Sequence, residues 1–169
     1  MISALRPFAV AATVFLTFAS ATPAKPDPGQ PAPAFKLVAL NGDSSVQLKD
    51  MAGKVVLMDF WASWCPPCRK SVPELSRLGV ENPGLVILAV SVDKEAKKAR
   101  KFLKGNATEG LVALHDAKQE VADKYGIEGM PSAVLIDKKG IVRFRKDGYG
   151  EGDLEKLKAE AAKLMEEKL

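Results

Sequence analysis

Two stretches of the chain are built almost entirely of apolar residues. They are Val55 to Phe60 and Leu85 to Val92, and the first is interrupted only by Asp59. Continuous apolar runs of this length are typical of central strands that are covered on both faces. We therefore expect these two segments to form the middle of a sheet.

Shorter apolar runs occur in pairs that predict antiparallel hairpins. One hairpin is expected over 35–48, with its turn at Asn41-Gly42-Asp43, and another over 132–145, with its turn at Asp137 to Gly140. The turn residues are of the kind that accept a positive φ angle. A short strand is also expected over 111–114.

Apolar residues at helical spacing predict four helices. The predicted helices cover 66–80, a segment that follows Asp93 as its N-cap, 117–125 and 152–167. Strands separated by helices imply parallel crossovers, and the second hairpin adds antiparallel strands. The expected fold class is α/β, a mixed sheet with helices on both faces and an N-terminal hairpin.

The first 21 residues have the pattern of a secretory signal peptide. Arg6 is the only charge, Phe8 to Phe18 is apolar, and Ala19-Ser20-Ala21 supplies small residues at a cleavage site. The apolar stretch is shorter than the about 20 residues of a membrane span. We expect cleavage and a periplasmic or other extracytoplasmic location; uncleaved, the segment would tether the protein to the outer face of the membrane.

Residues 22–33 are rich in proline and are expected to form an extended, mobile linker. The folded domain is accordingly expected over 34–169, as a monomer. The whole chain carries a net charge of +4, which is too mild to indicate nucleic acid as a partner. The basic cluster Lys97 to Lys101 fits the solvated face of a helix, with an acidic partner surface as the alternative.

The chain has only two cysteines, Cys65 and Cys68. Small disulfide-stapled scaffolds carry several bridges, and a structural zinc site needs four ligands, so neither is expected and no metal is predicted. Two thiols separated by two residues can close a disulfide. A strand that leads into a helix at such a pair puts the first sulfur at the helix N-terminus, which favours its thiolate. The pair thus predicts electron exchange.

The segment Asp59 to Cys68 resembles the active-site strand and loop of thioredoxins, and Tyr125 to Ser132 resembles their cis-proline segment. The leading hairpin, the order of elements and the export signal are most similar to TlpA/ResA-like thiol–disulfide oxidoreductases. The resemblance covers about 34–169. It implies a thioredoxin-like fold and a protein dithiol–disulfide oxidoreductase whose only redox group is the Cys65–Cys68 disulfide, without another cofactor.

The resemblance also implies a role for each site residue. Cys65 would attack a substrate disulfide and Cys68 would resolve the mixed disulfide. Asp59 would be a buried proton acceptor behind Cys68, with a raised pKa. Pro131 would be the cis-proline that leaves the Met130 backbone free to pair with a substrate strand, and Trp64 with Met130 would form an apolar rim for the substrate.

The sequence departs from the family pattern at two positions. Many TlpA/ResA-like proteins have a glutamate three residues after the second cysteine, where this chain has Ser71, and Glu74 lies one turn further on. Thioredoxins usually have a lysine on the next strand near the buried acid, and 85–92 contains none. Proton handling and the choice of partner are the properties that these departures affect.

Pro67 before Cys68 resembles the reducing thioredoxins. We therefore expect a potential nearer to about −270 mV, as in thioredoxin, than to about −120 mV, as in the oxidase DsbA. The expected activity is reduction of protein disulfides, with apocytochrome c as one target and a membrane-embedded thiol protein as electron donor. The alternatives are a net oxidant or isomerase, a thiol peroxidase and a copper(I)-binding module.

Overall fold

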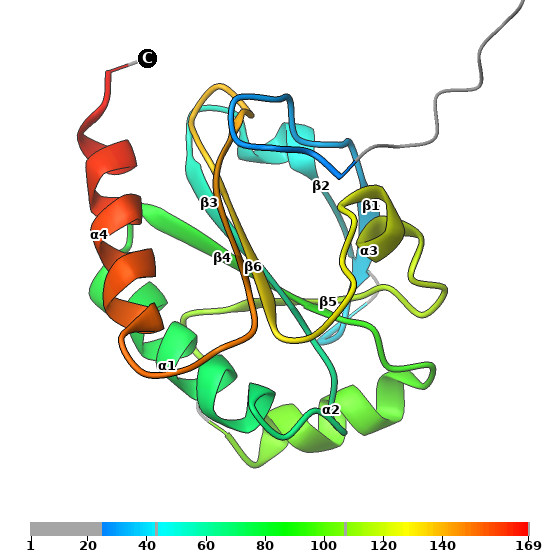
Figure 1. Cartoon of the computed structure of the whole chain (residues 1–169). Coiled ribbons are helices and arrows are strands. Elements are labelled where there is room, and N and C mark those ends of the chain that lie inside the picture. The colour runs from blue at the N-terminus through cyan, green and yellow to red at the C-terminus, as the bar shows by residue number, and fades with distance from the viewer. Residues whose placement is uncertain (1–24, 43, 107, 169) are drawn as a thin grey trace, which may run out of the picture.

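The computed structural model describes residues 25–42, 44–106 and 108–168. The predicted signal peptide, 1–21, lies outside the described residues. A seven-stranded mixed sheet forms the centre of the fold (Figure 1), in the order β2-β1-β5-β4-β3-β6-β7. Its strands are β1 (Lys36–Ala39), β2 (Ser45–Gln47), β3 (Val55–Trp61), β4 (Leu85–Ser91), β5 (Val112–His115), β6 (Ser132–Ile136) and β7 (Val142–Asp147).

The strand directions confirm the predicted mixture of parallel and antiparallel pairs. β3 runs parallel to β4, and β4 runs parallel to β5. β6 is antiparallel to both β3 and β7, and the N-terminal hairpin of β1 and β2 joins the sheet through an antiparallel pair of β1 with β5. The two longest apolar runs of the sequence are therefore neighbouring central strands, as predicted.

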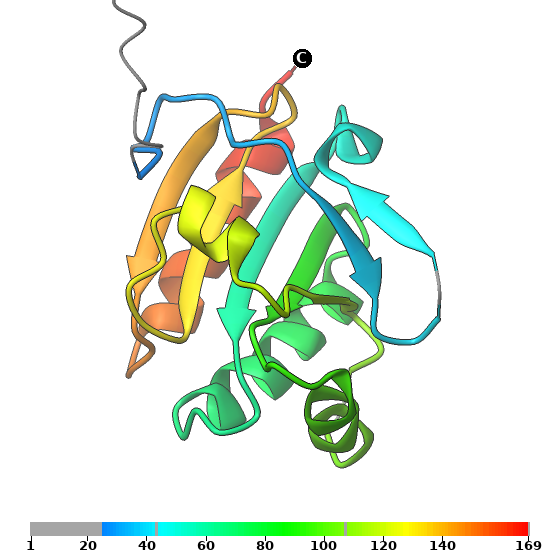
Figure 2. The ribbon, with the colours of Figure 1, turned by 90° about the vertical axis from the view of Figure 1, so that its right-hand side faces the viewer.

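Helices cover both faces of the sheet (Figures 1 and 2). α1 and α4 pack together on one face, and α3 lies on the other, while α2 lies beyond the end of the sheet at which β3 and β4 finish. The helices are α1 (Cys68–Glu81), α2 (Ala96–Lys104), α3 (Glu120–Lys124) and α4 (Asp153–Glu166), with a short 3-10 helix, η1 (Leu48–Met51). No helix in the described part of the chain is long and apolar enough to cross a membrane.

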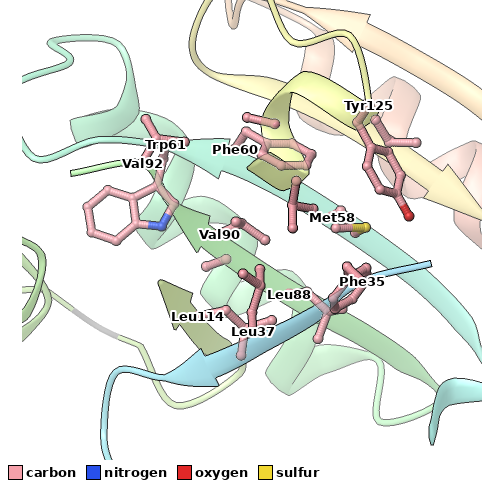
Figure 3. Packing of buried hydrophobic residues seen from close by; sticks show 14 of the residues in the cluster. Phe35, Leu37, Met58, Phe60, Trp61, Leu88, Val90, Val92, Leu114 and Tyr125 are labelled. Atoms are coloured by element: carbon pink, nitrogen blue, oxygen red, sulfur yellow. The ribbon is translucent and has the colours of Figure 1, made fainter. Parts of the chain in front are cut away.

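Alternate residues of β3 enter two different hydrophobic clusters. Val55 and Leu57 pack with residues of α1 and α4, whereas Met58 and Phe60 pack on the opposite face with Phe35 and other residues that Figure 3 shows. This alternation follows from the two-residue period of a strand. It places Asp59, which has the parity of Val55 and Leu57, on the face covered by α1 and α4.

The structure differs from the mobile linker predicted over 22–33. Within this segment Gly29 N–H donates to the Val142 carbonyl (2.7 Å), Val142 N–H donates to the Gln30 carbonyl (2.9 Å), and Pro26 is buried. The Pro33 carbonyl accepts a hydrogen bond from the Tyr125 hydroxyl at 2.8 Å. Long-range contacts that composition does not reveal make residues 25–33 an ordered part of the domain.

Candidate active site

The cysteine pair lies at the junction of β3 and α1. Cys65 is in the loop that follows Trp61, and Cys68 is the first residue of α1, so the helix begins two residues later than the sequence predicts. The two residues form a disulfide with their Cα atoms 5.3 Å apart. Cys68 is completely buried, whereas Cys65 retains 3% exposure. Cys65 is therefore the more exposed member of the pair.

Three further predicted site residues lie near this junction, at the same end of the sheet. Phe60, near the end of β3, is paired with Ser132 at the start of β6. The residues just before Ser132 therefore lie at the end of the sheet that carries the disulfide. The Met130–Pro131 peptide bond there is cis. Pro131 is buried, Met130 is partly buried, and Trp64 is 62% exposed beside Cys65. The exposed indole is thus an apolar surface next to the disulfide.

Asp59 is buried in the middle of the sheet. Its strand neighbours are Ala89 and Ala133, whose small side chains leave room around the carboxyl group. Its Oδ2 atom has no hydrogen-bond partner among the described residues. Burial without a counter-charge raises the pKa of Asp59 well above its ordinary value, because a carboxylate is poorly stabilised away from water. The group is thus suited to exchanging a proton with a thiol.

A tyrosine and a glutamate lie on the same side of the sheet as Asp59. The Tyr149 hydroxyl, in the connection before α4, donates to Glu74 Oε2 of α1 at 2.5 Å. Burial, this hydrogen bond and, to a smaller extent, the Asp59 charge raise the pKa of Tyr149. The sequence had singled out Glu74 only as a partial substitute for the family glutamate, and no pattern in the sequence indicated Tyr149.

Ser71 occupies the position of that glutamate and is completely buried in α1. Its hydroxyl has no hydrogen-bond partner in the described part of the chain. A buried hydroxyl carries no charge, so Ser71 cannot exert the electrostatic effect of a carboxylate on the cysteine pair.

Asp93 has a role that the sequence did not predict. Its carboxylate accepts hydrogen bonds from Ser63 N–H (2.9 Å), the Ser63 hydroxyl (2.7 Å) and the Ser91 hydroxyl (2.9 Å). The predicted N-cap function is wrong, because Glu95 occupies that position at α2 and makes no side-chain cap. Asp93 instead fixes the loop that carries Cys65, and the lone histidine, His115, donates from Nε2 to the Asp93 carbonyl at 2.7 Å.

The described residues contain no group of three or more His, Cys, Asp or Glu side chains that could hold a metal ion.

Comparisons with known proteins agree with this geometry. The Redoxin family matches residues 27–162. ResA of Bacillus anthracis, a thiol-disulfide oxidoreductase, is 34% identical over 116 residues, which are 68% of this chain and 66% of ResA. The thioredoxin-like protein YneN of Bacillus subtilis is 38% identical over 119 residues, 68% of each chain. The chain thus spans just under two thirds of the length of ResA.

A solved structure extends the similarity to the fold. The crystal structure of a candidate thiol:disulfide interchange protein DsbE from Chlorobium tepidum superposes with a TM-score of 0.78 and 35% identity, covering 83% of this chain and 99% of that one. The expected thioredoxin-like fold and the resemblance to ResA-like proteins are therefore confirmed. On the strength of the sequence match and the fold together, this chain belongs to the redoxin family.

Proposed function

We propose that this protein is a thiol–disulfide oxidoreductase that reduces disulfides of other proteins outside the cytoplasm. The observation that carries the proposal is the asymmetry of the cysteine pair. Cys65 retains slight exposure beside an exposed tryptophan, whereas Cys68 is completely buried in the first turn of α1. Asp59 is buried in β3, the strand that leads into the loop with Cys65. Such an arrangement separates the sulfur that attacks from the sulfur that resolves.

The reaction begins with the reduced enzyme. The Cys65 thiolate attacks one sulfur of the substrate disulfide, so a Cys65–substrate bond forms, the substrate bond breaks and the other substrate sulfur leaves as a thiolate. The 14-residue helix α1 points its N-terminus at this loop and favours the negative charge on Cys65. Trp64 and the Met130 backbone would hold the substrate segment against the site.

The second step resolves the mixed disulfide. Asp59, as a carboxylate, accepts the Cys68 proton, and the Cys68 thiolate attacks Cys65 Sγ and expels the second substrate thiolate. Two electrons have then passed from the enzyme dithiol to the substrate, and the Cys65–Cys68 disulfide has formed. Because burial raises the pKa of Asp59, its carboxylate is a stronger base toward the Cys68 thiol than an exposed aspartate would be.

Each further cycle requires a thiol donor that reduces Cys65–Cys68 again. The apolar segment Phe8 to Phe18 and the small residues after it support export of the protein. Because extracytoplasmic compartments are oxidising, a membrane-embedded thiol protein is the donor that this location requires. Apocytochrome c is one candidate substrate within this proposal.

Trapping of the mixed disulfide tests the assignment of the two cysteines. The Cys68→Ser variant lacks the resolving sulfur, so we expect it to accumulate partner proteins on Cys65 that a reductant releases and mass spectrometry identifies. The Cys65→Ser variant is the matched control and should trap almost nothing, because Cys68 is buried. Trapping by Cys65→Ser but not by Cys68→Ser would refute the assignment.

The direction of electron flow is tested separately by the reduction potential of Cys65–Cys68. A reductant requires a potential below that of protein disulfide isomerase, about −180 mV. A value above that limit would favour a net oxidant or isomerase with the same two cysteines.

A further inference from the structure

A groove of about 430 Å³ lies beside the redox-active disulfide, between the active-site loop and α2. One wall is formed by Ser63, two residues before Cys65, and by Arg69, which follows Cys68 directly. The other wall is the exposed side of α2 and the turn after it. The groove is lined by Ser63, Arg69, Lys98, Lys101, Phe102, Gly105 and Asn106.

The groove is fixed rigidly to the active site. Phe102 packs against Trp61, the last residue of β3, with ring centroids 4.9 Å apart. Ser63, on the opposite wall, donates two hydrogen bonds to the Asp93 carboxylate, which also accepts one from the Ser91 hydroxyl. A ligand in the groove would therefore keep a defined position relative to Cys65.

The charge of the groove is strongly positive. Arg69, Lys98 and Lys101 line it, and no carboxylate does. Lys98 forms an exposed ion pair with Glu95 at 2.8 Å, whereas Arg69 and Lys101 have no ion-pair partner among residues 25–42, 44–106 and 108–168. The nearby carboxylate of Asp93 is buried and already accepts three hydrogen bonds. At least two cations are thus available to a ligand.

We propose that this groove binds an acidic segment of the partner protein, next to the partner's reactive cystine. The inference rests on the proposed function and adds to it the chemistry of the partner. Clustered cations and an apolar side chain in one groove match glutamate or aspartate side chains, whose methylene groups can lie against Phe102 while their carboxylates reach Arg69 and Lys101.

The position of the groove is compatible with the other contacts of the substrate. In the sheet β3 lies between β4 and β6, so α2, which follows β4, and Met130, which precedes β6, lie on opposite sides of the disulfide. A partner segment can therefore pair with the Met130 backbone on one side of its cystine and place acidic residues in the groove on the other.

Two peptides that differ only in charge test the proposal. Each contains one disulfide, flanked by three glutamates in the first and by three glutamines in the second. The rate at which each peptide oxidises the reduced full-length protein is followed by tryptophan fluorescence at low ionic strength. We expect the glutamate peptide to react about threefold to tenfold faster, because exposed ion pairs and electrostatic steering contribute effects of this size. Added salt should remove the difference.

Variants on one helix separate the groove from the general charge of the protein. Lys101→Glu should bring the glutamate-to-glutamine rate ratio to about one or below. Lys97→Glu, a matched change at an exposed residue of α2 outside the groove, should leave the ratio near that of the wild type. Both positions are exposed, so neither change should affect folding.

Equal rates for the two peptides with the wild type, or an equal effect of Lys97→Glu and Lys101→Glu, would overturn the inference while leaving the proposed function intact. If neither peptide oxidised the reduced protein, the proposed function would fail, and this inference with it.

Discussion

Asp59 is a carboxyl group in the centre of a fully buried strand, and it has no cation beside it. In the folded protein burial raises its pKa, whereas in the unfolded chain the pKa stays near the ordinary value of about 3.9. Between these two values the folded state holds one more proton than the unfolded state. The free energy of unfolding must therefore fall as the pH rises through this range.

Replacement of Asp59 by asparagine should remove this pH dependence. We expect Asp59→Asn to be more stable than the wild type at pH 7 by on the order of 1 kcal/mol or more, because no charge has to be buried, and the difference should shrink toward pH 4. Urea unfolding of the oxidised proteins at several pH values measures it. Asp123→Asn, at an exposed position, is the control that should follow the wild type at every pH. A variant less stable than the wild type at pH 7 would contradict the assignment of Asp59 as a buried, isolated acid.

The same substitution should slow disulfide reduction. Without a base to take the Cys68 proton, resolution of the mixed disulfide should become rate-limiting, and the steady-state rate of insulin reduction should fall about tenfold or more at pH 7. The loss should lessen as the pH rises, because a growing fraction of Cys68 then ionises without help. A rate equal to that of the wild type across this pH range would remove Asp59 from the mechanism.

At the scale of the elements, a single residue joins the active-site loop after β3 to the ends of β4 and β5. Asp93 follows β4, accepts hydrogen bonds from Ser63 of the loop after β3, and its carbonyl accepts one from His115 at the end of β5. The loop that carries Cys65 has no regular structure of its own. Its position therefore depends on this buried carboxylate.

Removal of the Asp93 carboxylate should loosen that loop. Asp93→Ala leaves the Ser63 N–H without its partner, so we expect a loss of about 1–3 kcal/mol in the free energy of unfolding. Asp50→Ala is the matched control: the Asp50 carboxylate accepts one hydrogen bond, from the Gln47 N–H, at an exposed site, and its loss should cost much less. Thermal unfolding of the oxidised variants compares the two. Equal losses would show that Asp93 does not hold the loop.

The elements that the sequence predicts best are those whose signal is local. β6 has the predicted bounds, Ser132 to Ile136, because an unbroken apolar run lies between a proline and an aspartate. The predicted helix over 117–125 shrinks to Glu120–Lys124, since Gln119 has a left-handed φ of 60° and Asp116 caps the shorter helix through Val121 N–H and Ala122 N–H. Such a cap becomes visible only once the chain has folded.

In the candidate site, too, the features that the sequence predicts are those formed by residues close together along the chain. The spacing of Cys65 and Cys68 and the apolar strand before them could be read directly from the sequence. The role of Asp93 and the contact of Tyr149 with Glu74 could not, because each joins residues that lie 30 and 75 positions apart. The basic groove likewise requires the turn after α2 to lie beside the start of α1.

At the scale of the whole molecule, the segment 25–33 joins the N-terminal region to the far edge of the sheet. Pro31 forms an isolated antiparallel bridge with Ile141, just before β7, and Ala32 N–H donates to the Gly140 carbonyl at 2.9 Å. The segment thus covers the start of an edge strand that would otherwise leave its backbone groups unpaired. An N-terminal proline-rich stretch serves here as part of the core architecture.

Truncation measures how much this segment contributes. A protein that begins at Ala34 loses the hydrogen bonds of Gly29, Gln30 and Ala32 with the β6–β7 hairpin and the acceptor for the Tyr125 hydroxyl. At about 0.5–1.5 kcal/mol for each of these four hydrogen bonds, we expect a loss of about 2–6 kcal/mol and a fall in Tm of about 5–20 °C. A protein that begins at Lys25 keeps all of these contacts and is the matched control. Differential scanning calorimetry of the two oxidised proteins measures the difference in Tm. Equal Tm values would mean that the segment lies on the domain without stabilising it. The stable folded unit would then begin at Ala34, as the sequence predicts.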